Sequence, residues 1–112
     1  MIDLTINVGI GKILHRKNIT LEFIQKYHQK PFDWELITNL KIITLEFISK
    51  NINFPWSWYY LSTKDFLTLK FIEDHIEKPW NFKTLSNSKI VTIEFCKNYR
   101  HKPWDWLLVY KH

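Results

Sequence analysis

The six tryptophans are the most distinctive chemical feature of this 112-residue sequence. They fall in two columns of a 24-residue period: Trp56, Trp80 and Trp104, and, two residues further on, the column of Trp34, Trp58 and Trp106. Evenly spaced aromatic rings could stack nucleobases or grip the prolines of a partner. They could also wedge one repeat against the next, and because aromatic residues fill these columns in every repeat we favour packing.

Lysines offer a second kind of chemistry. Lys30, Lys78 and Lys102 each precede a proline, and Phe54 takes that place in the remaining repeat. These lysines could form a row of phosphate contacts, but solvated loop lysines are the commoner outcome of such a pattern.

Metal-binding and catalytic patterns are missing from the sequence. The five histidines show no ligand spacing, and Cys96 has no second cysteine to pair with. There are no paired carboxylates, no Ser-His-Asp set, no glycine-rich phosphate loop and no dinucleotide fingerprint. We therefore expect no catalytic, cofactor or metal site, no small-molecule substrate, and a protein that is not an enzyme.

A 24-residue repeat organises the whole chain. All the prolines share this spacing, at Pro31, Pro55, Pro79 and Pro103. So do four threonines, at Thr20, Thr44, Thr68 and Thr92. An unbroken register without insertions is typical of repeat arrays. We expect one repeat domain over residues 1–112, with repeats at 20–43, 44–67, 68–91 and 92–112. Cys96 falls in a column of isoleucines, so we expect it to be a small buried apolar residue.

Residues 1–19 look like half a repeat that has lost its proline and its tryptophans. Val8, Ile10 and Ile13 keep the apolar register of the later repeats. Terminal repeats are usually atypical because one of their sides meets water. We therefore expect residues 1–19 to form an N-terminal cap.

Each repeat is predicted to hold two short helices. Thr20 can cap the first, which should stop near residue 29 because Pro31 disfavours helical backbone at the residue before it. The second helix should begin at Pro31, or slightly later with Asp33 as its cap, and run to about Asn39. The sequence thus predicts an all-α fold: a short α-solenoid of about four helix-turn-helix repeats behind the cap.

A strand is the alternative for the first half of each repeat. Ile19 to Phe23 alternates apolar and polar residues, and a leucine-rich-repeat-like or β-solenoid coil would also fit a 24-residue period. Helix is favoured because Phe23 and Ile24 are consecutive apolar residues, helical spacing continues to His28, and glycine is scarce. The strand alternative stays open at this point.

The net charge of +5 is concentrated at the two ends of the chain. Residues 20–67 are neutral as a whole, whereas a solenoid that tracks nucleic acid should carry a continuous basic stripe. Nucleic-acid binding is therefore the alternative rather than the first choice. No apolar run approaches the roughly 18 residues of a membrane span and no signal peptide is recognisable, so we expect a soluble protein without membrane contact.

Recognition of a partner should use the columns that vary between repeats. On the second helices, these columns hold Glu35, Tyr59, Lys83 and Leu107, followed by Leu36, Tyr60, Thr84 and Leu108. The adjacent pair of tyrosines most resembles a binding surface. The candidate partner-binding residues are Tyr59, Tyr60, Lys83, Leu107 and Leu108. The last helix is also more apolar than its counterparts, so it either packs on itself or forms an exposed edge for a partner.

The repeat resembles a known type of sequence. The segments His101-Lys-Pro-Trp-Asp-Trp106 and Ile43-Thr-Leu-Glu-Phe-Ile48 are similar to the tandem 24-residue Pro-Trp repeats of uncharacterised proteins in giant DNA viruses that infect amoebae. The resemblance covers residue 19 to about residue 110. It implies a viral origin and a place in the virion or the host-cell cytoplasm, and it implies no activity, cofactor or functional residue.

Together, these observations predict a protein-binding or assembly module, either a minor virion component or an adaptor to host proteins. An open stack of repeats also invites end-to-end self-association.

Overall fold

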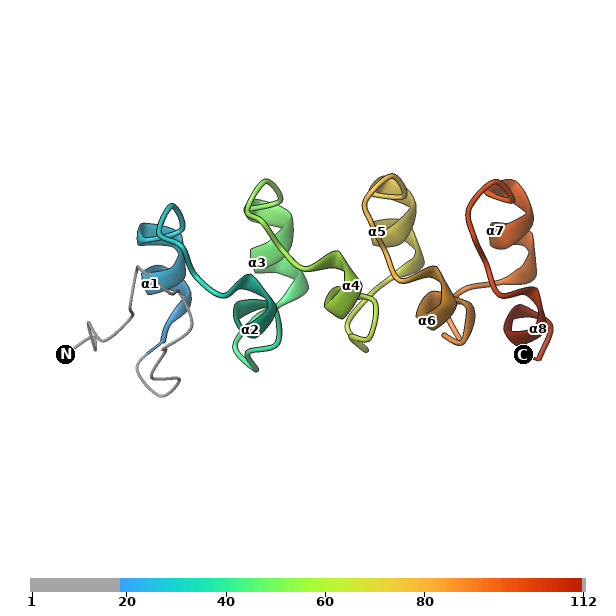
Figure 1. Cartoon of the computed structure of the whole chain (residues 1–112), viewed down its shortest axis with the longest axis horizontal. Coiled ribbons are helices and arrows are strands. Elements are labelled where there is room, and N and C mark those ends of the chain that lie inside the picture. The colour runs from blue at the N-terminus through green and yellow to red at the C-terminus, as the bar shows by residue number, and fades with distance from the viewer. Residues whose placement is uncertain (1–18, 112) are drawn as a thin grey trace. The chain divides into compact units, whose positions relative to one another are not determined.

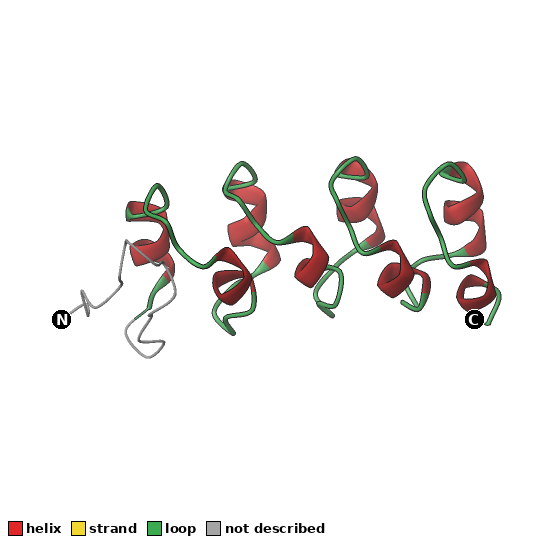
Figure 2. Cartoon of the chain, in the orientation of Figure 1, coloured by secondary structure: helices red, strands yellow, loops and turns green. Residues whose placement is uncertain are grey.

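The computed structural model describes residues 19–111, and all regular secondary structure in this range is helical (Figures 1 and 2). No strand occurs among these residues. The prediction of an all-α repeat fold of the solenoid type is therefore confirmed, and the strand alternative is wrong for the described repeats. The predicted N-terminal cap lies outside the described residues, except for Ile19.

The helices are short and alternate in length. The first helix of each repeat has six residues: α1 (Leu21–Lys26), α3 (Leu45–Lys50), α5 (Leu69–Asp74) and α7 (Ile93–Asn98). The second helix has four or five: α2 (Trp34–Thr38), α4 (Trp58–Leu61), α6 (Phe82–Ser86) and α8 (Trp106–Val109). Helices of this length are not stable alone in water, so packing between elements must hold them.

The chain divides into two compact units, Met1–Ser57 and Trp58–His112. The first contains α1 to α3 and the second α4 to α8. The boundary falls inside the predicted repeat 44–67. That residues 1–112 form a single repeat domain stays a prediction.

A threonine starts the first helix of every repeat. The Oγ1 atom of Thr20 accepts a hydrogen bond of 3.0 Å from the backbone N–H of Phe23, which would otherwise lack a partner at the helix start. The other three threonines of the column make the same bond, at 3.0 or 3.1 Å. The predicted capping role is confirmed.

The first helix ends earlier than predicted. Helix α1 stops at Lys26 rather than near residue 29, and Tyr27 has φ −112° and ψ 23°, outside the helical region. The carbonyl of Tyr27 then accepts from the N–H of Lys30 at 2.9 Å, so a separate turn replaces the last helical residues.

Each proline is the centre of a tight three-residue turn. The residue after Pro31 donates its N–H to the carbonyl of the residue before it, from Phe32 to Lys30, at 2.7 Å. The same bond is 2.8 Å long around the other three prolines. Proline suits this turn because its ring fixes φ close to the value that an inverse γ-turn requires.

The second helix therefore starts after the proline turn and not at Pro31. The side chain of Asp33 caps α2 by accepting from the N–H of Leu36 at 3.2 Å. Asn81 and Asp105 cap α6 and α8 in the same way. Of the two predicted starts, the one with Asp33 as the cap is confirmed.

Three columns of apolar side chains form the core of the repeats. They are almost completely shielded from water: Ile19, Ile43, Leu67 and Val91; Ile24, Ile48, Ile72 and Cys96; and Ile37, Leu61, Leu85 and Val109. Cys96 is fully buried in the isoleucine column, as predicted, and burial raises the pKa of its thiol to about 11. It therefore behaves as an apolar residue rather than as a nucleophile.

Candidate functional site

The tryptophans that follow the prolines sit between two other aromatic rings. In the second unit, Trp80 meets Trp58 of α4 edge-on, with ring centres 5.0 Å apart, and Phe71 of α5 at 6.2 Å. Trp104 makes the corresponding contact with Phe82 at 5.1 Å. In each case, the second helix of one repeat and the first helix of the next enclose the indole, which is an arrangement that aromatic rings prefer.

The first unit repeats this arrangement. Trp56 meets Trp34 edge-on at 5.3 Å and Phe47 at 5.9 Å, both with the ring planes 83° apart. Trp34 also meets Phe54 at 5.8 Å, and Phe54 stacks on His28 at 4.4 Å. Phe54, which replaces the lysine of the other repeats, thus enlarges the aromatic cluster of this unit.

The indole N–H explains why tryptophan rather than phenylalanine follows most of the prolines. Trp80 donates its Nε1–H to the carbonyl of His75, the residue that ends α5, at 2.8 Å. Trp56 and Trp104 make the corresponding bonds at the ends of α3 and α7, both at 2.9 Å. Each bond gives a carbonyl at a helix terminus the partner that the helix does not provide.

Burial decides how much of the aromatic ladder could contact a ligand. Four tryptophans are buried, at 4–6% exposure: Trp56, Trp58, Trp80 and Trp104. Trp34 and Trp106 are half-buried. The burial supports the packing interpretation of the ladder, and it leaves only two indoles with enough exposed surface for stacking on a ligand.

A column of buried hydroxyl groups joins successive repeats. Ser86 donates to the carbonyl of Phe82 at 2.6 Å and accepts from the backbone N–H of Asp105 in the next repeat at 2.9 Å. Ser62 and Thr38 make the corresponding pairs of bonds. No role was predicted for this column from the sequence, although its 24-residue spacing is visible, because a small polar residue near a helix end usually faces water.

Two of the lysines that precede prolines lie over aromatic rings. The Nζ atom of Lys78 lies 5.4 Å from the ring centre of Trp58, and that of Lys102 lies 5.9 Å from the ring centre of Phe82. The side chain of Lys102 is only 15% exposed and forms a 2.9 Å ion pair with Glu77. The interpretation as a solvated loop lysine is therefore wrong for Lys102, because the preceding repeat supplies both a ring and a carboxylate. That ion pair lowers the pKa of Glu77.

The predicted partner-binding residues all lie on the second helices of the second unit, which follow one another through that unit (Figure 1). We call them the outer row: Tyr59, Tyr60, Lys83, Leu107 and Leu108. Leu107 is 81% exposed and Tyr59 59% exposed, and the rings of the two tyrosines meet edge-on at 5.5 Å. Lys83 is exposed, whereas Leu108 is half-buried.

The last helix has a packed side and an exposed side, and whether the exposed side meets a partner stays a prediction. Val109 is fully buried against the repeat, whereas Leu107 and Tyr110 are exposed. One side of α8 packs, and the other remains an open edge.

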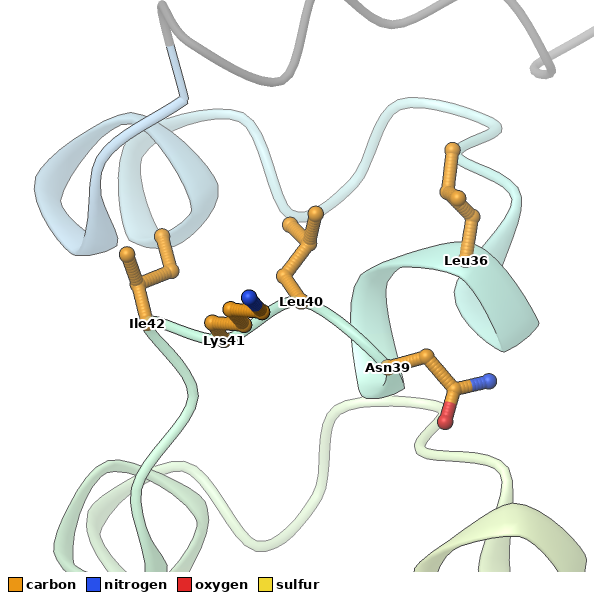
Figure 3. Close-up of a pocket in the computed structure, with 5 residues that line it drawn as sticks. All are labelled: Leu36, Asn39, Leu40, Lys41 and Ile42. Atoms are coloured by element: carbon orange, nitrogen blue, oxygen red, sulfur yellow. The ribbon is translucent and has the colours of Figure 1, made fainter.

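The grooves on the described residues were not predicted, and the following two are examples from the two units. In the first unit, a groove of about 430 Å³ is lined by Leu36, Asn39, Leu40, Lys41 and Ile42, and Leu40 and Ile42 point to the same side of the loop that follows α2 (Figure 3). In the second unit, a shallow groove of about 390 Å³ is lined by Lys97, Arg100, Trp106 and Tyr110. Sequence periodicity could not reveal them, because each combines residues from different columns.

Residues 19–111 contain no group of three or more His, Cys, Asp or Glu side chains that could hold a metal ion. No helix in this range is both long enough and apolar enough to cross a membrane.

Comparison of the chain with protein families, with curated proteins and with solved structures found no significant match.

Proposed function

We propose that this protein is a non-enzymatic repeat module that binds another protein or takes part in an assembly. The exposure of the outer row is the observation that carries the proposal. Large apolar side chains such as Leu107 and Tyr59 stay exposed on the second helices, while four of the six tryptophans are buried by packing. Exposed apolar and aromatic groups that gather on one set of elements are typical of interaction surfaces.

Binding would use shape complementarity rather than chemistry. Tyr59 and Tyr60 would be the anchors, because tyrosine buries a large apolar ring and keeps a hydroxyl for a hydrogen bond. Leu107 would extend the apolar contact along α8, and Lys83 between them would select a partner with a carboxylate at that place.

Our proposal includes a viral origin for this module. The similarity of the Pro-Trp repeat to those of giant amoeba-infecting viruses supports a minor virion component or an adaptor to host proteins. The virion and the host-cell cytoplasm are the corresponding locations.

Nucleic-acid binding is the second candidate, and the net charge of +5 favours it. Its weakness is the ladder itself, because four of the six indoles are buried between other rings and have little surface for a base.

A capture experiment with a matched variant tests the proposal. Tagged wild-type protein and the double variant Tyr59→Ala, Tyr60→Ala are incubated with a lysate of virus-infected amoebae, treated with nuclease and washed at high salt. We expect the wild type to retain a discrete protein that the double variant loses, while far-UV circular dichroism shows that both are folded. Ile90→Ala removes a comparably exposed apolar side chain outside the outer row and should retain the partner.

Two outcomes would contradict the proposal. Equal retention by the double variant would exclude the outer row as the binding surface. Recovery of nucleic acid that high salt removes would favour the second candidate. Recovery of only this chain would favour assembly by self-association over the binding of another protein.

A further inference from the structure

The last repeat carries a basic aromatic groove that the proposed function does not use. We call it the end groove: Lys97, Arg100, Trp106 and Tyr110. Both cationic side chains are exposed, and the Nε atom of Arg100 donates to the carbonyl of Lys97 at 3.3 Å, which holds the guanidinium near α7. Trp106 is half-buried, and its ring lies 5.9 Å from that of Tyr110.

The third repeat shows what covers the same face when another repeat follows it. Phe82 occupies the position of Trp106, and the next repeat places Trp104 edge-on against it at 5.1 Å and 88°. The Nζ atom of Lys102 lies 5.9 Å from the same ring. The position of Trp106 is thus one at which this fold receives an aromatic ring.

In the polar contacts on this face, the third repeat supplies the hydrogen-bond acceptors and the fourth repeat supplies the donors. Glu73 accepts a 2.7 Å hydrogen bond from the hydroxyl of Tyr99, and Glu77 accepts one of 2.9 Å from Lys102. The hydrogen bond to Glu73 raises the pKa of Tyr99, and the bond and charge of Lys102 lower the pKa of Glu77. The covered face is therefore acidic, and the repeat that covers it brings the donors.

In the last repeat, hydrogen-bond donors replace the acceptors on this face. Lys97 stands at the position of Glu73, His101 at that of Glu77, and Arg100 replaces the buried Ile76. Asp105 directly precedes Trp106, but its carboxylate already accepts a hydrogen bond from the N–H of Leu108 as a helix cap. A further repeat of the same kind would place its donors against donors.

The hydroxyl that fastens the next repeat is also replaced. Position 110 corresponds to Ser86, which receives the backbone N–H of the following repeat, and Tyr110 is 58% exposed instead of buried. Its ring lies 5.9 Å from that of Trp106. Both differences distinguish this face from the face of the third repeat, on which another repeat docks.

We propose that the end groove binds an acidic polypeptide segment that carries an aromatic side chain. The aromatic ring would pack on Trp106 at the position where Trp104 packs on Phe82. The carboxylates beside it would accept charge-assisted hydrogen bonds from Lys97 and Arg100, which reproduces the internal interface with its polar direction reversed.

A peptide fits this groove better than a nucleotide strand. In the internal interfaces, the ring of the second helix meets its partner edge-on, at 75–88°. Bases, by contrast, stack on aromatic rings with their faces parallel.

Fluorescence anisotropy tests the proposal directly. The probe is a short labelled peptide with one central tryptophan flanked by glutamates, titrated with the full chain at low and physiological salt. We expect saturable binding that the variant Lys97→Glu, Arg100→Glu weakens by about tenfold or more, because it replaces both donors by acceptors. Trp106→Ala should also weaken binding, but with less effect on the salt dependence.

The control variant Lys41→Glu, Lys89→Glu makes the same change in net charge at exposed positions outside the groove and should bind as the wild type does. The double variant Tyr59→Ala, Tyr60→Ala should bind this peptide normally, so the failure of either proposal can be recognised separately.

The proposal would be overturned by any of four results. These are the absence of binding at millimolar protein, equal binding of a peptide with lysines in place of the glutamates, an equal loss in the control variant, and preferential binding of labelled oligothymidylate. Concentration-dependent self-association of the wild type in sedimentation equilibrium, abolished by Lys97→Glu, Arg100→Glu, would assign the groove to a second copy and also overturn it.

Discussion

The third and fourth repeats present the same face in two different states. In the third, the face is acidic and is covered: Glu73 and Glu77 accept hydrogen bonds from the next repeat, and Ser86 accepts its backbone N–H. In the fourth, the corresponding residues are basic or aromatic, and Tyr110 is exposed. The core positions stay fully buried in both, with Ile72 and Leu85 in the third repeat and Cys96 and Val109 in the fourth. The buried core is thus common to both repeats, whereas the polar residues of this face differ between the covered and the uncovered repeat.

Removal of the aromatic ring from each face should give the largest difference in the loss of unfolding free energy. Phe82→Ala takes away a buried ring and its edge-on contact with Trp104, and should cost about 3–5 kcal/mol. Trp106→Ala takes away a half-buried ring and should cost about 1–2 kcal/mol. Urea unfolding followed by circular dichroism measures both values. Equal losses would show that the outer face of the last repeat contributes as much as an internal one.

Removal of the buried hydroxyl should have an intermediate effect. Ser86→Ala leaves the N–H of Asp105 without its acceptor and should lower the free energy of unfolding by about 1–3 kcal/mol. Ser86→Thr is the matched control, since Thr38 makes both hydrogen bonds at the equivalent position of the first unit. If Ser86→Ala unfolds at the same urea concentration as the wild type, the hydroxyl column does not fasten successive repeats.

The ion pair between the two repeats should give the smallest effect, and it should depend on pH. The pKa of Glu77 is lowered from its usual 4.5, so the folded chain binds this proton more weakly than the unfolded chain. Its contribution to stability is therefore complete above pH 4.5 and is lost as the pH falls through the lower folded value. Glu77→Gln should remove this small pH-dependent increment, because the carboxylate is exposed. Thermal melts at pH 7 and pH 3 measure it, and an unchanged difference between the two melts would exclude the ion pair as its source.

Much of the fold could be predicted from the sequence because its determinants are local. A threonine caps the helix that directly follows it, and a proline fixes the turn in which it lies. The roles of Thr20 and Pro31 therefore depend only on residues close to them in the sequence. The 24-residue period then transfers each assignment to the other repeats. The early end of α1 was missed because the turn after Tyr27 depends on a backbone bond that no residue type specifies.

The contacts between repeats could not be predicted in the same way. From the sequence, Lys102 is a loop lysine and Ser86 a surface serine. Only the structure shows that Lys102 contacts Phe82 and Glu77, and that Ser86 accepts a hydrogen bond from Asp105. Such roles depend on residues of the neighbouring repeat, whose distance in space the period alone does not give. The outer row was predicted only from the variability of its sequence columns, and its binding role stays a prediction.

The most direct test of this comparison is to offer each kind of face a further repeat. Two extended chains carry a copy of residues 88–111 after Lys111, which keeps the 24-residue register. One keeps the native outer face, and the other carries Lys97→Glu, Arg100→Ile, His101→Glu and Tyr110→Ser, the pattern of the third repeat. Urea unfolding measures both the stability and the surface exposed on unfolding.

We expect that only the chain with the third-repeat pattern gains stability and a larger denaturant slope from the added repeat, because only that face supplies the acceptors and the hydroxyl. An equal gain by the chain with the native face would contradict this expectation.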